Sequence, residues 1–538
     1  MFSNSVNFEK IGYLMLLTVF FSVSIPGIFW WLGQAISPIF FPVSVGLSIL
    51  FVCKPTNIPI KEVFIYIMLL LLSLLLCLVI PDMSWDGQAY HQPMVYALAY
   101  GWNPIEDSHN TIIDDIWNMN IWIDHYLRGM EISAATIVSF TNNLEMGKAV
   151  NMIFMLSVLT ESLHLLTAST FNLSRKKAVL YSSLLAFPIV FVNYGFTFYI
   201  DIATYYLVFW VLALLYQYTL LKKRKFWEML FVVIFLAATI KLNTFFWICY
   251  ILFFYCIYLL YQNKIRLFRN IVAIGSLAIL FGVATTDFNP IITNTLDHHN
   301  PFYPIGTKEA NDIGVNAQPN LIKDKNRLAQ VAISIFSRPN DNMETPYLNP
   351  YRITYNYNIR SLGFGAKLGG GGMFFIEIFV ISILLVGICL YAKFNKTVFN
   401  IILLFLLALF ILPYGSNYRY VPFISILPIF LLLYTEIVGF KYSCLYKIRS
   451  VCLFLLCTNV IISIPFFFRN TCLSAKSQKE AIEFVRNTTL KEPYHSKNWS
   501  FNYKLNGNNI PDRQIFSNNN ENYEPLPNQF GPPIYIHK

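Results

Sequence analysis

The chain has 538 residues, of which 56% are hydrophobic, 17% aromatic and only 13% charged, and its mean hydropathy is +0.51. Soluble globular proteins carry about 25% charged residues, so this composition excludes a water-soluble enzyme. The formal net charge of +10 does not indicate a nucleic-acid partner, because the Lys and Arg residues lie mainly in short clusters between apolar runs. We therefore expect a membrane protein with many crossings.

Thirteen apolar runs approach the roughly 20 residues that a crossing helix needs. They begin near Ile11, Pro38, Val63, Ala149, Val179, Ile202, Phe226, Phe245, Ile271, Met373, Val398, Tyr420 and Val451. The sequence thus predicts an all-α polytopic membrane domain of about 13 transmembrane helices over residues 1–468. The first run, Ile11 to Leu32, lacks a small-residue cleavage pattern, which indicates a retained anchor.

Cationic loops alternate with uncharged or acidic loops between these runs. The cations are Lys54 and Lys61; Arg175, Lys176 and Lys177; Lys222 to Lys225; Lys264, Arg266 and Arg269; Lys393 and Lys396; and Lys441, Lys447 and Arg449. The positive-inside rule places all of them in the cytoplasm. It predicts a cytoplasmic N-terminus and an outer C-terminus in the cell (inner or plasma) membrane. Outer loops then span about 81–147 and 287–372, and residues 469–538 form a short, partly ordered outer tail.

The first outer loop is acidic and contains a predicted helix. Asp107 and Ser108 could cap a helix that carries an aromatic stripe and an i,i+4 ion pair between Asp124 and Arg128. The stripe residues are Met119, Trp122, Tyr126 and Met130. Such a helix is expected in the membrane interface. Its alternative role is only to brace the loop.

Polar groups gather directly after the third apolar run. The stretch Pro81 to Pro93 carries Asp82 and Asp86, together with Tyr90 and His91. Charge beside hydrocarbon is costly and is usually kept for a function or a partner. A carboxylate there could act as a general base or hold a divalent cation such as Mg²⁺ or Mn²⁺. The alternative is that both carboxylates merely cap helices.

Three short motifs resemble those of polytopic glycosyltransferases of the GT-C superfamily. The first is Trp85-Asp86-Gly87-Gln88-Ala89-Tyr90-His91-Gln92-Pro93 in the first outer loop. The second comprises Asn289-Pro290, Asn294-Thr295 and Asn300-Pro301-Phe302-Tyr303-Pro304, and the third is Asn417-Tyr418-Arg419-Tyr420-Val421-Pro422. The similarity in arrangement extends from about Ile11 to Phe468.

The resemblance implies an inverting transfer of a sugar from a polyprenyl-phosphate carrier to a glycan, lipid or protein acceptor at the outer face, within surface glycan assembly. The family's first-loop Asp, which serves as base, corresponds to Asp86, with Asp82 as the other candidate. Among the substrate-binding candidates, His91 could orient the base or contact the sugar, and Tyr90 and Gln88 lie beside it. An ordinary structural role is the alternative for His91.

The phosphate leaving group requires positive charge at the same boundary. Lys241 and Arg419 are the candidates, and a guanidinium binds phosphate bidentately. Asp201 could pair with either cation or assist the acceptor. The alternatives are snorkelling to the headgroups for the two cations and helix capping for Asp201.

Two other functions stay open. A polysaccharide polymerase or ligase would depend more on Arg352, Arg360 and His298 than on Asp86. A transporter or flippase would need charges in the middle of the membrane, for which only Glu161 and His164 qualify. His298 and His299 are adjacent, so they do not form a convincing zinc pattern.

Overall fold

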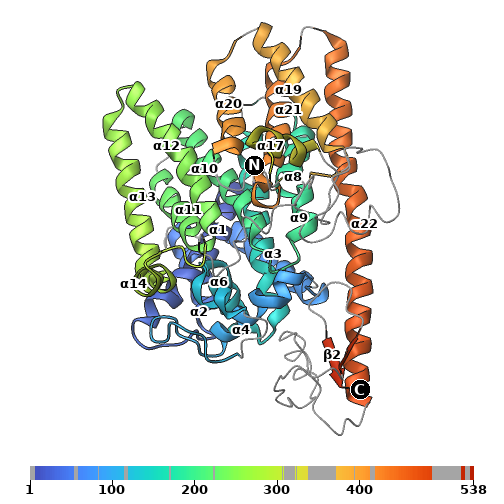
Figure 1. The fold of residues 1–538 in the computed structure, drawn as a ribbon. Coiled ribbons are helices and arrows are strands. Elements are labelled where there is room, and N and C mark those ends of the chain that lie inside the picture. The colour runs from blue at the N-terminus through green and yellow to red at the C-terminus, as the bar shows by residue number, and fades with distance from the viewer. Residues whose placement is uncertain are drawn as a thin grey trace.

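The structure is a computed structural model of the whole chain, shown in Figure 1. It describes residues 6–53, 59–82, 84–113, 119–168, 171, 173–221, 225–305, 307, 322, 324–336, 371–372, 374–392, 394–411, 418–440, 442–487, 523–526 and 534–537. Asp114, Asp115, Arg352, Arg360 and Asn417 lie outside the described residues.

The chain is an all-α polytopic membrane protein, because eight described helices are long and apolar enough to cross a membrane. These are α1 (Phe8–Trp30), α3 (Ile60–Val79), α7 (Ala149–Thr167), α10 (Asp201–Leu221), α12 (Leu242–Tyr261), α13 (Ile265–Thr285), α19 (Phe375–Ala392) and α22 (Ser443–Asn487). Five shorter helices accompany them: α2 (Phe40–Val52), α8 (Arg175–Ala186), α11 (Phe226–Ile240), α20 (Lys396–Ile411) and α21 (Ile426–Val438). A helix therefore stands at each of the thirteen predicted positions.

Shorter elements connect or cover these helices. They are η1 (Gly87–His91), α4 (Gln92–Ala99), α5 (Asn120–His125), α6 (Gly129–Thr141), η2 (Leu144–Lys148), α9 (Ile189–Tyr194), η3 (Phe288–Ile292), α14 (Thr293–His298), α17 (Arg327–Phe336), η4 (Tyr418–Tyr420) and η5 (Pro422–Ser425). Near the C-terminus, β1 (Tyr523–Leu526) pairs antiparallel with β2 (Ile534–His537).

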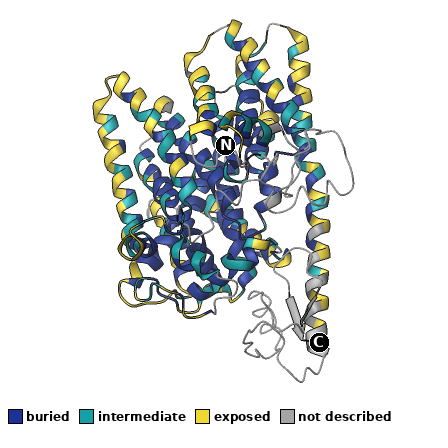
Figure 2. Ribbon diagram, viewed as in Figure 1, coloured by how far each residue is buried: buried dark blue, intermediate teal, exposed yellow. Residues whose placement is uncertain are grey.

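Helices α1, α7, α10 and α11 form the centre of the molecule, where buried residues concentrate (Figure 2). Helix α1 is apolar on all sides and packs against α2 and α7, as expected for a helix surrounded by others. The flanking helices α3, α12, α13 and α22 instead expose large apolar side chains, among them Leu75, Phe253, Leu280 and Phe454. Lipid tails can cover such surfaces without the cost that water would impose.

The two ends of the bundle differ in what they carry (Figure 1). The connections between α12 and α13 and between α19 and α20 lie at one end, whereas α4, α14 and the C-terminal end of α22 lie at the opposite end. The first two connections carry predicted cytoplasmic cations, including Lys264 and Lys396. This arrangement agrees with the alternation of loops that the charges predict.

The first loop departs from prediction. The expected long interface helix is wrong, because α5 ends at His125, Tyr126 is extended, and α6 begins only at Gly129. Helix α6 is buried and packs against α1 and α4. The expected cap at Asp107 is also wrong, since its carboxylate accepts hydrogen bonds from the His109 amide at 3.1 Å and the Thr111 hydroxyl at 3.2 Å, within a turn.

The predicted ion pair between Asp124 and Arg128 does not form. The Arg128 Nη2 donates instead to the Asp124 main-chain oxygen at 2.7 Å, because no helix turn connects the two residues. Farther along the chain, α22 continues past residue 468 into the predicted tail and ends at Asn487. In the second large loop, α17 packs against α20.

Candidate functional site

Four charged residues from four separate segments meet in one cluster, which we call the charge cluster: Asp86, Asp201, Lys241 and Arg419. Asp86 directly precedes η1, and Asp201 is the first residue of α10. Lys241 interrupts the helix between α11 and α12 with an extended backbone. Arg419 lies in η4 at the start of the segment leading to α21. Each residue thus stands at a helix end, where the chain leaves the apolar region.

The contacts within the charge cluster form a chain. Lys241 Nζ donates to Asp201 Oδ1 at 2.5 Å, and Arg419 Nε donates to Asp201 Oδ2 at 3.2 Å. The Nη2 of Arg419 donates to Asp86 Oδ2, which also accepts from the Tyr90 hydroxyl at 3.1 Å. Two carboxylates therefore balance two cations. The structure brings together five of the eight candidate site residues in this way.

Aromatic rings and backbone contacts hold the two cations. The Arg419 guanidinium lies 4.5 Å from the centre of the Tyr199 ring, and the Lys241 Nζ lies 5.1 Å from that of Tyr420. Such cation–π contacts add to the ion pairs. The Tyr420 carbonyl accepts from Asn243 Nδ2 at 2.6 Å, so the first turn of α12 fixes the segment that carries Arg419. The predicted phosphate-binding pair is therefore preorganised.

Burial and the neighbouring carboxylates act in opposite directions on the pKa values of the two cations. Burial lowers the pKa of Lys241 below its usual value, even though the Asp201 carboxylate favours the charged form. For Arg419 burial also favours the neutral form, but the Asp86 and Asp201 carboxylates outweigh it and raise the pKa further. Both carboxylates already have cationic partners within the protein. These paired carboxylates do not fit the divalent cation, Mg²⁺ or Mn²⁺, that the sequence suggested. Among the described residues, no group of three or more His, Cys, Asp or Glu side chains is placed to hold a metal.

Asp82 occupies a different environment from Asp86. Its side chain is fully buried; Oδ1 accepts from the Ser84 amide and Oδ2 from the Phe198 amide, both at 2.8 Å. Its own amide donates to Glu145 Oε2 at 2.9 Å. Burial, followed by the Glu145 charge, raises the pKa of Asp82. These contacts bind the first loop to the segment before α10, and Asp86 is the carboxylate that faces the cations.

The remaining first-loop candidates divide between the two environments. Tyr90 contacts Asp86, whereas Gln88 is fully buried and its Nε2 donates to the Asp82 carbonyl at 3.2 Å. His91 is buried beside α6, where its Nδ1 donates to Glu131 Oε1 at 2.5 Å. A Cβ at Gly87 would overlap Asp82 and Ser84. The hydrogen bonds of Gln88 and His91 thus support the first loop.

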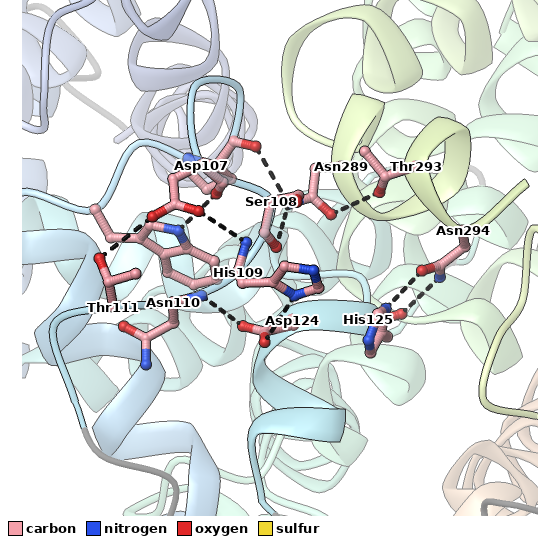
Figure 3. Close-up of polar contacts among 12 residues, drawn as sticks. Asp107, Ser108, His109, Asn110, Thr111, Asp124, His125, Asn289, Thr293 and Asn294 are labelled. Carbon is pink, nitrogen blue, oxygen red and sulfur yellow. Dashed lines mark hydrogen bonds and ion pairs between the residues drawn. The ribbon is translucent and has the colours of Figure 1, made fainter. Parts of the chain in front are cut away.

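The asparagines of the second motif fasten the two predicted outer loops to each other (Figure 3). Asn289 Nδ2 donates to the Ser108 carbonyl at 2.9 Å. His125 Nδ1 donates to Asn294 Oδ1 at 2.7 Å, and Asn294 Nδ2 returns a bond to the His125 carbonyl at 3.2 Å. These asparagines dock α14 onto α5, which in turn packs against η1.

Three candidates belong to the alternative functions: Glu161, His164 and His298. Glu161 is buried and accepts from Gln217 Nε2 at 2.6 Å. The Nε2 of His164 lies 3.7 Å from Glu9 Oε2. His298 stacks on Tyr303 with ring centres 3.6 Å apart. Glu161 thus sits in a hydrogen-bonded interior and His298 in the loop junction.

Sequence reasoning missed several residues that shape the site. Tyr199 contacts Arg419, and Glu131 contacts His91. On α7, Asn151 Nδ2 donates to the Thr197 carbonyl at 2.8 Å and to the Tyr199 carbonyl at 3.1 Å. Asn151 could have been found from the sequence, because it is a buried asparagine within an apolar run.

Compared with known proteins, the chain matches no family model, no curated protein and no solved structure.

Proposed function

We propose that this protein is a glycosyltransferase of the GT-C type, which moves a sugar from a polyprenyl-phosphate carrier to a glycan, lipid or protein acceptor at the outer face of the cell membrane. One observation carries the proposal: the contact of Asp86 and Arg419, with Lys241 and Asp201 behind them, at the end of a membrane bundle. The proposed topology has thirteen crossings, a cytoplasmic N-terminus and an outer C-terminus.

The charge cluster contains the groups that such a transfer needs. In the proposed reaction the acceptor hydroxyl oxygen attacks the anomeric carbon and passes its proton to Asp86. The bond from that carbon to the phosphate oxygen breaks, and the electron pair stays on the phosphate. Positive groups held beside the leaving oxygen stabilise this charge, and Arg419 and Lys241 supply them. The attack and the departure occur on opposite sides of the carbon, so its configuration inverts.

A position beside hydrocarbon suits a lipid carrier. The exposed apolar faces of α3 and α12 can lie against lipid, and α12 begins one residue after Lys241. A polyprenyl chain can therefore remain in the membrane while its phosphate reaches the boundary where the cations lie. A water-soluble sugar nucleotide would not need such a location.

The test is an assay of the purified protein with a panel of polyprenyl-phosphate sugars and acceptors. We expect transfer with at least one donor, and a loss of about 100-fold or more in Asp86→Asn, which removes the base. Glu106→Gln is the matched control, because Glu106 is an exposed carboxylate in the same loop. Full transfer by Asp86→Asn, with correct insertion of both variants, would remove Asp86 from the mechanism.

A further inference from the structure

Arg419 bridges two carboxylates that differ in accessibility. The Asp201 side chain is 1% exposed, whereas those of Asp86 and Arg419 are each 14% exposed. The bond to Asp201 uses Nε, and the bond to Asp86 uses Nη2, at the outer edge of the guanidinium. A ligand that approaches from outside would therefore reach the contact with Asp86 before the contact with Asp201.

Asp201 is also the more firmly held of the two. Both of its oxygens accept bonds from cations, one from Lys241 and one from Arg419. It begins α10, where the helix dipole stabilises a negative charge. Asp86 lies before a single π-helical turn, and besides Arg419 its Oδ2 has the Tyr90 hydroxyl as partner. Removing Arg419 from Asp86 leaves this second hydrogen bond intact, so Asp86 is the carboxylate that can exchange.

The pairing has a chemical consequence for Asp86. The same carboxylate oxygen, Oδ2, accepts from both Arg419 Nη2 and the Tyr90 hydroxyl. While the contact with Arg419 lasts, that oxygen is engaged by the protein and is not offered to an acceptor hydroxyl. A phosphodiester anion offers Arg419 the same planar arrangement of two oxygens that a carboxylate does. It can take the place of Asp86 at Nη2 while Asp201 continues to hold Nε.

We infer that the carrier phosphate displaces Asp86 from Arg419 and so releases the base only when a donor is bound. This inference rests on the proposed function and adds its regulation. In the exchange one anion replaces another at Arg419, and no covalent bond changes. The acceptor proton then moves to the released Asp86 as the sugar is transferred. Asp201 is the positioning residue that keeps both cations in place throughout.

Reactivity of Asp86 toward dicyclohexylcarbodiimide measures its release, because this reagent modifies a carboxyl group that can take up a proton and spares one held by a guanidinium. The full-length protein in detergent is treated with and without a short-chain polyprenyl monophosphate, with the uncharged polyprenol as control. Peptide mass spectrometry quantifies the modification at Asp86 and at the exposed Glu106. Binding of each lipid is measured in parallel by native mass spectrometry.

We expect the phosphate lipid to raise modification of Asp86 at least about threefold and to leave Glu106 unchanged, whereas the polyprenol changes neither. In Arg419→Gln, modification of Asp86 should be high without any lipid. Binding of the phosphate without increased modification overturns the exchange, and transfer activity in the same preparation would leave the proposed function intact. Increased modification of Asp86 with no transfer from any donor would instead contradict the proposed function, but it would support the displacement of Asp86 from Arg419 by phosphate. Absence of phosphate binding contradicts both.

Discussion

The Nε of Arg419 donates to the Oδ2 of Asp201 at 3.2 Å, across 218 residues of chain. This bond joins the start of α10 to the segment that leads into α21, and Lys241 completes it from the start of α12. Two other segments of the chain thus reach the carboxylate at the start of α10. The position of the two cations in the proposed reaction depends on that carboxylate more than on any other group.

Asp201→Asn should therefore destabilise the protein and disturb both cations. Removing one partner of a buried ion pair typically costs about 3–5 kcal/mol, because the remaining charge keeps its desolvation penalty. We expect a lower thermal midpoint, measured by intrinsic fluorescence in detergent, and transfer reduced by about 100-fold. Glu106→Gln, an exposed substitution, should change neither quantity. An unchanged midpoint for Asp201→Asn would show that the pairs contribute little to stability.

The Asp82→Asn variant tests which of two carboxylates, Asp82 or Asp86, acts as the base. The amide oxygen can replace one acceptor, but the amide nitrogen would face a backbone donor, either Ser84 or Phe198. Leaving such buried donors unsatisfied costs about 1–3 kcal/mol each. We expect a lower midpoint with transfer per folded molecule reduced far less than in Asp86→Asn. The reverse order of activities would identify Asp82 as the base.

Gly87→Ala tests the packing that positions Asp86. A Cβ at Gly87 would overlap the side chains of Asp82 and Ser84, so η1 must shift and move Asp86 with it. We expect loss of transfer and a lower thermal midpoint. Gly46→Ala in α2 is the matched control, since a Cβ there meets no atom within 4 Å. It should leave activity intact and stabilise its helix by about 0.5–1 kcal/mol.

Acid should loosen the junction of the two predicted outer loops, where His125 contacts Asn294. Burial lowers the pKa of His125 to about 4, and the nearby His298, His109 and Arg128 charges act in the same direction. An unfolded His titrates near pH 6.5, so the unfolded chain binds more protons between about pH 6.5 and 4. The contribution of His125 to the free energy of unfolding is fully present above about pH 6.5 and is lost as the pH falls toward about 4. His125→Gln should flatten the pH dependence of the thermal midpoint in that range.

Transfer should continue in the presence of EDTA. Arg419 and Lys241 already supply positive charge at the proposed phosphate position, and both carboxylates of the charge cluster are paired with them. The assay compares initial rates with and without EDTA, followed by addition of Mg²⁺ or Mn²⁺. A loss of activity that either ion restores would show that a metal binds despite these pairs.

Hydropathy was sufficient to locate the helices, and the loop charges predict which face of the membrane each connection occupies. Each signal is local: roughly 20 apolar residues form a helix, and the Lys and Arg residues between such runs indicate the cytoplasmic side. Helices accordingly stand at all thirteen expected positions, from α1 to α22. The same local signals failed in the first loop, where buried tertiary contacts divide one amphipathic pattern into α5 and α6.

The motif after α3 drew attention to both Asp82 and Asp86, but spacing could not assign their roles. That distinction depends on the Phe198 amide, which lies 116 residues from Asp82, and on Arg419, which lies 333 residues from Asp86. No local pattern encodes such distances, because they follow from how the helices pack. In the folded bundle Asp82 is buried and holds the first loop in place, whereas Asp86 faces the two cations.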